Sequence, residues 1–354
     1  VYFRADASTQ IGSGHVMRCM ALADEIRSRG AEVNFICRIA EGNLIERLHD
    51  SDYNVCTVSG QDVMSDARQT QDIIEKDECC AEWLIVDHYD LDSEWERQLK
   101  PLVKKVMVID DLANRRHDCD LLMDQNLYQD MRHRYNRLIP DYCQRLIGPM
   151  YALLRREFRQ PGEKIRARNG VIRRIMVFFG GSDLNNETLK ALKAILMLKT
   201  ADITVDVVIG QNNPHRNDIF EFAASMPQIY CHYNINNMAE LMSAADLCIG
   251  AAGVTMLERC CLGMPSIVIA VAKNQIEASE YMAKKNLLYY LGESNTVTVD
   301  RIKEALDLFL SHPEYLADYS LACRQICDGR GAERCADAVL AYKFVDNERS
   351  KKQI

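Results

Sequence analysis

The chain has 354 residues, of which 48% are hydrophobic and 27% are charged, and its formal net charge at pH 7 is -8. This composition is typical of a folded globular protein, and the length suits two domains of ordinary size. The acidic balance argues against wholesale nucleic-acid binding, and no apolar run approaches the roughly 18 to 20 residues that a membrane span requires. The first residues show no signal-peptide pattern.

The cysteines show no pattern of a disulfide or metal framework. There are 14 of them, including the adjacent pairs Cys79–Cys80 and Cys260–Cys261, and none forms a CxxC motif. We therefore expect reduced, buried thiols in a cytoplasmic protein and no metal site; a redox or zinc role is the alternative.

Short apolar runs alternate with helical patterns along the chain, which predicts βαβ units and parallel sheets. The first series of expected strands comprises residues 2–5, 33–37, 83–87, 106–110 and 121–124, with a helix over 16–28 that ends before Gly30. The second series begins at "RIMVFFGGSD" (174–183) and continues at 205–210, 246–250 and 266–271. Each series opens with a strand, a glycine turn and a helix, so we predict two tandem doubly wound α/β domains.

The expected domain boundaries are 1–155, a basic linker over 156–173, a second domain over 174–345 and a flexible tail over 346–354. Whether the last helix crosses back to the first domain stays open. Residues 155–174 hold eight Arg/Lys against two Glu. We interpret this segment as a solvated linker; the alternative is a basic rim of an interdomain cleft that meets an anionic ligand.

A cleft between two such domains is the default ligand site, because the carboxyl ends of the parallel strands open toward it. In the first domain, Gly12 and Gly14 permit positive φ and a close approach of a ligand to the backbone. The helix that follows offers N–H groups and a positive dipole end, which suit a phosphate and favour a neutral His15. His15 is therefore a candidate general base; the alternative is a helix cap or a surface histidine.

The second domain repeats this arrangement. Gly181 and Ser182 follow a strand in "FFGGSD", and "GAAGVTMLERCC" places Gly253 and Thr255 before a helix that carries Glu258. The helix N-terminus suits a diphosphate, and the Glu258 carboxylate suits a ribose diol, although a solvated carboxylate is the alternative. Asn274 and Gln275 follow the next strand.

Several motifs together resemble a known family. "GAAGVTMLERCCLGMP" and "IGSGHVMRCMALA" look like the donor motif and glycine loop of MurG-type GT-B glycosyltransferases. "RADASTQIGSGHVMRC", "LIVDHYDLD", "GPMYALLRREF", "FFGGSD" and "VAKNQIEASEYMAKKN" resemble, in order over about residues 2–335, the PseG family of UDP-sugar hydrolases of pseudaminic acid synthesis. The fold so implied is GT-B-like, with two Rossmann-like domains.

The resemblance implies hydrolysis of UDP-2,4-diacetamido-2,4,6-trideoxy-β-L-altropyranose to UDP and the free sugar, with inversion and without a metal or other cofactor. His15 matches the catalytic base that activates water, and Tyr89 and Asn274 match polar pocket residues. The residues expected to bind the substrate or UDP are Gly12, Ser13, Gly14, Tyr151, Arg155, Gly181, Ser182, Ile235, Ala252, Gly253, Val254, Thr255, Glu258 and Gln275. Among these, Ile235 matches the place of uracil recognition.

Three other functions remain in view. A MurG-like glycosyltransferase would use the same donor motif with an acceptor in place of water. A non-catalytic nucleotide-sugar sensor would not need His15, Tyr89 and Asn274 together. An NAD-dependent oxidoreductase would require a full GxGxxG with a distant acid, which neither glycine turn provides.

We expect a monomer that binds a UDP-sugar, with no nucleic-acid or membrane partner. We expect residues 114–120, which include His117, to form a solvated loop. For His88, which directly precedes Tyr89, a structural role is the alternative to a role in the pocket.

Overall fold

A computed structural model describes residues 1–60, 62–77, 81–159, 166, 168, 170–198 and 202–350. The chain divides into two compact units. The first unit consists of Val1–Asn126, Asp130–Arg155 and Arg330–Ile354, and the second consists of Leu127–Gln129 and Arg156–Gly329.

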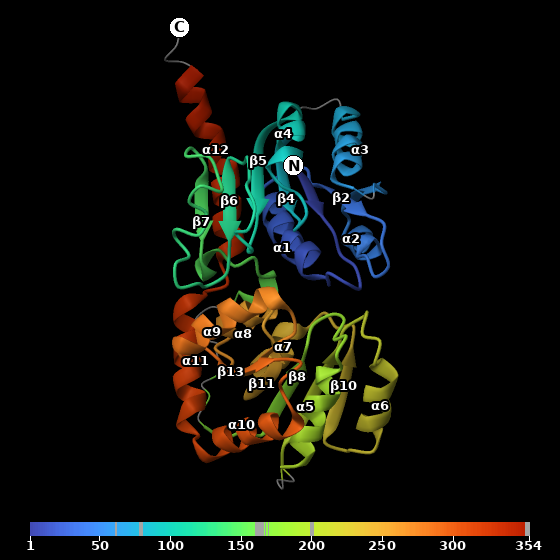
Figure 1. The fold of residues 1–354 in the computed structure, drawn as a ribbon, viewed down its shortest axis with the longest axis vertical. Coiled ribbons are helices and arrows are strands. Elements are labelled where there is room, and N and C mark those ends of the chain that lie inside the picture. The colour runs from blue at the N-terminus through green and yellow to red at the C-terminus, as the bar shows by residue number, and fades with distance from the viewer. Residues whose placement is uncertain are drawn as a thin grey trace. The chain divides into compact units, whose positions relative to one another are not determined.

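The first unit is built on a seven-stranded parallel sheet with the order β3-β2-β1-β4-β5-β6-β7 (Figure 1). The order reverses between β1 and β4, which makes the carboxyl ends of these two strands the switch point of the fold. The elements are β1 (Tyr2–Ala5), α1 (Gly14–Ser28), β2 (Asn34–Arg38), α2 (Ile45–Asp50), β3 (Asn54–Val58), α3 (Val63–Glu75), β4 (Ala81–Asp87), α4 (Ser93–Leu99), β5 (Val103–Ile109), β6 (Leu121–Asp124), β7 (Gln144–Ile147) and α12 (Gly331–Ser350).

Alternation along the strands divides the buried side chains between two faces of this sheet. On one face, Phe3, Ile85 and Ile109 pack in one apolar cluster with residues of α1, α2 and α12. On the other face, Leu84 and Val108 pack in a second cluster with residues of α3 and α4. The same alternation decides which face each polar residue at the strand ends presents.

The second unit contains a six-stranded parallel sheet with the order β10-β9-β8-β11-β12-β13, and its switch point lies between β8 and β11. Residues of α5, α6 and α10 share one apolar cluster with this sheet. The elements, most of which are labelled in Figure 1, are β8 (Arg174–Phe178), α5 (Glu187–Leu196), β9 (Thr204–Ile209), α6 (Arg216–Ala224), β10 (Ile229–Tyr233), α7 (Met238–Ala244), β11 (Leu247–Ala251), α8 (Thr255–Cys261), β12 (Ser266–Ala270), α9 (Ile276–Lys284), β13 (Tyr289–Glu293), α10 (Val299–Ser311) and α11 (Glu314–Ile326).

The sequence predicted the interior strands of both sheets but not β3, β7, β10 and β13, which are the four edge strands. These strands are partly exposed: β7, for example, has only one buried residue, whereas β8 and β11 are almost entirely buried. A search for continuous apolar runs finds strands that are covered on both faces and overlooks half-exposed edges.

The C-terminal helix α12 belongs to the first unit, where it contacts α1. Ala332, Cys335, Ala336 and Val339 of this helix lie in the same apolar cluster as the core of α1. The second unit therefore ends at Gly329, before the boundary at 345 that the sequence suggested. The helix continues to Ser350, into the segment expected to be a flexible tail; residues 351–354 lie outside the described residues.

One arginine of the basic segment 156–173, Arg168, is buried inside the second unit. Arg168 is buried and donates hydrogen bonds to the carbonyl groups of Met242, Ala245, Leu262 and Gly263. Burial and the nearby charge of Arg166 lower the pKa of Arg168 to about 10. The expectation of a solvated linker is thus wrong for Arg168, and residues 160–165, 167 and 169 lie outside the description.

All cysteines of the described residues are free thiols, and most of them are buried. The pair Cys79–Cys80 lies outside the described residues. Among the helices that the structure describes, none is long and apolar enough to span a bilayer.

Candidate active site

The switch point of the first unit carries a buried histidine–carboxylate pair. His15 is the second residue of α1, and Asp87 is the last residue of β4. The distance from His15 Nδ1 to Asp87 Oδ1 is 2.6 Å, and both side chains are almost fully buried. Asp87 shares the sheet face of Ile85, which is the face that α1 covers, and this explains why residues 72 positions apart meet.

Arg18 lies one turn further along α1 and binds the same carboxylate. Its Nε and Nη2 atoms donate to the two oxygens of Asp87, each at 2.6 Å. Burial alone would raise the pKa of Asp87, but the charges of Arg18 and His15 outweigh it and hold this pKa well below its usual range. Asp87 is therefore an ionised acceptor at neutral pH.

An ionised Asp87 determines which nitrogen of His15 carries the proton. Because a carboxylate only accepts hydrogen bonds, His15 Nδ1 must be the donor across the 2.6 Å contact. In the neutral imidazole this leaves the lone pair on Nε2. Among the described residues, no group hydrogen-bonds to Nε2. The contact with Asp87 also fixes the orientation of the imidazole ring.

Tyr89 and Asp111 border the same cluster. The ring of Tyr89 meets the ring of His15 edge to face, with 4.5 Å between the centroids. Asp111, just after β5, accepts a hydrogen bond of 2.8 Å from Arg18 Nη1. Burial and the Asp111 carboxylate raise the pKa of Tyr89 well above its usual value, so its phenol stays protonated. The structure thus brings the predicted His15 and Tyr89 together.

A second polar network lies on the opposite face of the sheet. Arg4 pairs with Asp6 and with Asp66 of α3, and His88 Nε2 lies 3.1 Å from Asp6 Oδ2. The Asp90 backbone N–H donates to His88 Nδ1. Both nitrogens of His88 are thus engaged, which gives this histidine the structural role considered as the alternative. Burial opposes ionisation of Asp6, but His88 and Arg4 hold its pKa well below the usual value.

The glycine turn before α1 agrees with the prediction in part. Gly12 has φ +78°, and no atom lies within 4 Å of the place where a side chain would begin. Gly14 does not have a positive φ and is instead the first residue of α1. Ser13 is the N-cap residue of α1 but makes no capping hydrogen bond with its side chain. Of the two glycines that permit a positive φ, Gly12 has one and Gly14 does not.

Tyr151 and Arg155 follow β7, three strands away from β4 in the sheet order. Tyr151 is partly buried against the apolar cluster that contains α12, and its carbonyl accepts a contact of 3.7 Å from Cys335 Sγ. Arg155 is half-buried at the last position of this segment of the first unit. The pair therefore follows the edge strand of the first sheet, and its role in substrate binding stays a prediction.

The switch point of the second unit carries the remaining predicted residues. Gly181 and Ser182 follow β8, and the Gly181 carbonyl accepts from Asn212 after β9 at 3.1 Å. The carboxylate of Asp183 accepts from the backbone N–H groups of Glu187 and Thr188 at 2.8 and 3.0 Å. The N-terminus of α5 is therefore occupied by the chain's own carboxylate.

The loop after β11 differs from this arrangement. Ala252, Gly253 and Val254 connect β11 to α8, which begins at Thr255, and no side-chain hydrogen bond caps this helix. Glu258 lies one turn into α8 and is only 6% exposed. Glu258 is therefore not the solvated side chain considered as the alternative.

Residues after β10 and β12 complete this edge of the second sheet. Gln275 accepts from the Val271 backbone N–H at 3.0 Å, and its amide nitrogen would lie 3.8 Å from a side chain built on Gly253. Asn274 is exposed in the short 3₁₀ turn Lys273–Gln275, and Ile235 is half-buried in the loop after β10. All three residues follow strands of the second sheet, and Gln275 lies near Gly253, whereas His15 and Tyr89 lie in the first unit.

Sequence reasoning missed Arg18, Asp87 and Asp111. A signal for the two carboxylates was present, because an aspartate stands at or just after the end of β1, β4, β5 and β6. Because the carboxyl ends of parallel strands share one edge, this pattern indicates that the aspartates lie near one another. The loop that contains His117 was also misjudged. His117 is buried, with Nδ1 2.6 Å from Glu96 of α4.

Comparisons with known proteins agree with this architecture. Residues 174–326 match the glycosyltransferase family 28 C-terminal domain. The chain is 28% identical to the UDP-2,4-diacetamido-2,4,6-trideoxy-β-L-altropyranose hydrolase of Campylobacter jejuni, over 80% of this chain and 96% of that protein. It is 26% identical to the uncharacterized protein MJ1062 of Methanocaldococcus jannaschii, over 79% of this chain, and the match spans only 57% of that relative.

Among solved structures, MurG of Acinetobacter baumannii matches with a TM-score of 0.64 and 14% identity, over 96% of this chain and 99% of that one. These findings confirm the resemblance to the PseG hydrolases and to MurG-like proteins. They also confirm the fold class, which is GT-B-like with two Rossmann-like parallel sheets.

Proposed function

We propose that this protein is a UDP-sugar hydrolase that acts on UDP-2,4-diacetamido-2,4,6-trideoxy-β-L-altropyranose and releases UDP and 2,4-diacetamido-2,4,6-trideoxy-L-altrose for pseudaminic acid synthesis. The observation that carries the proposal is the buried contact of 2.6 Å between His15 and Asp87, which directs the Nε2 lone pair of His15 away from the carboxylate. The likeness to the Campylobacter hydrolase over nearly its whole length supports the choice of substrate.

In the proposed reaction, His15 Nε2 accepts a proton from water while the water oxygen bonds to the anomeric carbon of the sugar. The bond from that carbon to the diphosphate oxygen breaks on the opposite side, so the configuration inverts and UDP carries away the bonding electron pair. Asp87 stabilises the imidazolium that forms, and the proton then passes to solvent. A diphosphate needs no protonation to leave, so one base is enough, and the step involves no metal or other cofactor.

Tyr89 contributes an uncharged phenol beside the His15 ring, and its oxygen can accept a hydrogen bond from the sugar or from the attacking water. Gly12, Ser13 and Gly14 border His15 and leave open space at Gly12 for the sugar. The weaker assignments of Tyr151 and Arg155 to substrate binding stay with the family resemblance alone.

The second unit is the proposed UDP site. The backbone of residues 252–255 holds the diphosphate, and the buried Glu258 accepts hydrogen bonds from the ribose diol. Ile235 contacts uracil through its backbone, and Gly181 and Ser182 border the nucleotide. Gln275, packed near Gly253, and the exposed Asn274 contribute amides to the sugar and diphosphate.

A MurG-like glycosyltransferase is the alternative, and the match of residues 174–326 to the glycosyltransferase family 28 domain favours it. The two activities share a nucleotide site and differ in what attacks the sugar. The carboxylate-bound histidine acts on water or on an acceptor hydroxyl alike, so only the reaction itself separates them.

The test is release of UDP from the diacetamido-trideoxy UDP-sugar in ¹⁸O-labelled water, with EDTA and without an acceptor. Release of UDP with ¹⁸O at the anomeric carbon supports the hydrolase. Release only after an acceptor is added supports the transferase, and tight UDP binding without any release supports a sensor. ¹⁸O found in UDP instead of the sugar would contradict attack at carbon.

A further inference from the structure

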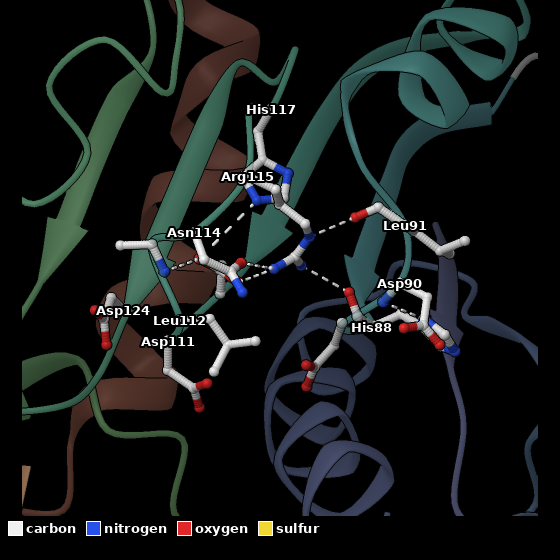
Figure 2. Close-up of polar contacts among 12 residues, drawn as sticks. His88, Asp90, Leu91, Asp111, Leu112, Asn114, Arg115, His117 and Asp124 are labelled. Atoms are coloured by element: carbon white, nitrogen blue, oxygen red, sulfur yellow. Dashed lines mark hydrogen bonds and ion pairs between the residues drawn. The ribbon is translucent and has the colours of Figure 1, made fainter. Parts of the chain in front are cut away.

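The turn that carries Tyr89 is fastened to a neighbouring strand end by one guanidinium group. Arg115 donates from Nε to the Leu91 carbonyl and from Nη2 to the His88 carbonyl, both at 2.8 Å. Its Nη1 donates to Asp110 Oδ1 at 2.7 Å. Figure 2 shows Arg115 between the segment with His88, Asp90 and Leu91 and the segment with Asp111 and Leu112. We call residues 88–91 the Tyr89 turn and residues 110–113 the Asp111 turn.

These contacts use all three nitrogen atoms of the Arg115 guanidinium group. The two carbonyl groups flank Tyr89 on both sides along the backbone, so Arg115 restrains the main chain that aims this ring. The third contact is an ion pair in which Asp110 is fully buried and the Arg115 side chain is 14% exposed. Burial raises the pKa of Asp110, but Arg115 and His117 reverse the effect and lower it below the usual value.

The Asp111 turn is held in a conformation that requires support. Ala113 has φ +49°, which is unfavourable for a residue with a side chain. Its backbone N–H donates to Asp110 Oδ2 at 2.9 Å, so the carboxylate that binds Arg115 also stabilises the strained residue. The adjacent Asp111 pairs with Arg18, which holds Asp87 and thereby His15.

We propose that Arg115 is a positioning residue of the active site, which ties the Tyr89 turn to the Asp111 turn and so fixes Tyr89 against His15. This inference rests on the proposed function for its effect on turnover, but the restraint of the turn is independent of any substrate. Among the described residues, Arg115 forms no hydrogen bond with His15 or with the Tyr89 side chain, and it acts through the backbone of residues 88–91 and through Asp110.

A lysine cannot replace this arrangement, because an ammonium group is a single point of charge without the planar fork. Arg115→Lys keeps the charge beside Asp110 but loses at least one carbonyl contact. We expect kcat to fall about 10- to 100-fold with KM for the UDP-sugar and affinity for UDP unchanged, because a small displacement of a catalytic group affects the chemical step. Arg97→Lys is the matched control, since Arg97 is exposed and, among the described residues, forms its ion pair with Asp118.

Two further measurements distinguish positioning from general stabilisation. The first is hydrogen exchange of the amides of residues 88–92 in the full-length protein, which should accelerate about tenfold in Arg115→Lys when roughly one hydrogen bond is lost, while α1 and α12 stay protected. The second is Arg115→Ala assayed with added guanidinium ion, which should restore part of kcat. If Arg115→Ala does not fold, Arg115→Lys provides the comparison.

Faster exchange at residues 88–92 together with a fall in kcat alone supports the inference. Unchanged exchange of these amides, or an equal loss of kcat and of UDP affinity, overturns it. If the wild-type protein neither hydrolyses nor transfers from a UDP-sugar, the proposed function fails, and the exchange rates of residues 88–92 still decide for or against the restraint by Arg115.

Discussion

Asp87 Oδ1 lies 2.6 Å from His15 Nδ1, and Arg18 donates hydrogen bonds to both oxygens of the same carboxylate. The arrangement fixes the orientation and tautomer of the imidazole before any substrate arrives. It also places a buried negative charge where the imidazolium would form during proton abstraction from water.

Asp87→Asn should leave the fold intact but lower kcat by roughly 10²- to 10⁴-fold, because an amide stabilises the wrong tautomer and no longer stabilises the imidazolium. Affinity for UDP should not change, since the proposed nucleotide site lies in the second unit. Steady-state kinetics and UDP titration measure the two effects. Asp90→Asn, an exposed residue of the same turn, is the control. A wild-type kcat in Asp87→Asn would show that the carboxylate does not act through His15.

Arg18→Gln should destabilise the protein by about 3 to 5 kcal/mol, because it leaves Asp87 and Asp111 without their buried cation. Chemical denaturation measures the free energy of unfolding. Lys104→Gln is a suitable comparison, since the ion pair of Lys104 with Glu82 is largely exposed and should contribute less than about 1 kcal/mol. If both variants lose similar stability, the buried network does not have the assigned role.

Acidification should weaken the fold through Asp6 and Asp87. Both carboxyl groups have a pKa below the ordinary value of 3.8 in the folded protein, so the unfolded chain takes up protons first as the pH falls. Their contribution is fully present above that value and decreases as the pH falls through it toward the folded-state pKa. Unfolding free energies measured from pH 7 to pH 3 should show this decrease, and Asp6→Asn should reduce its slope. A stability that rises toward pH 3 would disagree with this assignment.

Glu258→Gln should weaken UDP binding by roughly 1 to 3 kcal/mol, about 5- to 150-fold, through loss of a charged acceptor for the ribose diol. Calorimetric titration with UDP measures the change. Glu277→Gln on α9 removes an exposed carboxylate of the same unit and should leave the affinity unchanged. Equal affinities of the two variants would remove Glu258 from the nucleotide site.

The fold was largely predictable from the sequence, and the exceptions have a common cause. Interior strands such as β4 and β11 are covered on both faces and appear as continuous apolar runs, whereas the edge strands β3, β7, β10 and β13 do not. Glycine turns after β1, β8 and β11 identified the switch points. They did not reveal that Asp183 already caps α5, because that depends on the local path of the chain.

Within the candidate site, single residues were easier to predict than their partners. His15 stands out because it follows a glycine turn at the start of a helix. Its contact with Asp87 spans 72 positions and depends on which sheet face α1 covers, which no local pattern specifies. Two of the three contacts of Arg115 are also long-range, because they join the carbonyl groups of residues 88 and 91 to the segment after β5.

The most direct test compares His15→Ala with the wild-type protein in single-turnover hydrolysis of the diacetamido-trideoxy UDP-sugar, alongside UDP affinity. If His15 is the base, the rate of sugar release should fall by at least about 100-fold, while the affinity for UDP stays within about a factor of two. A rate close to that of the wild type would contradict the role of His15 as the base. A parallel loss of rate and UDP affinity would show that His15 supports the structure and does not perform the chemistry.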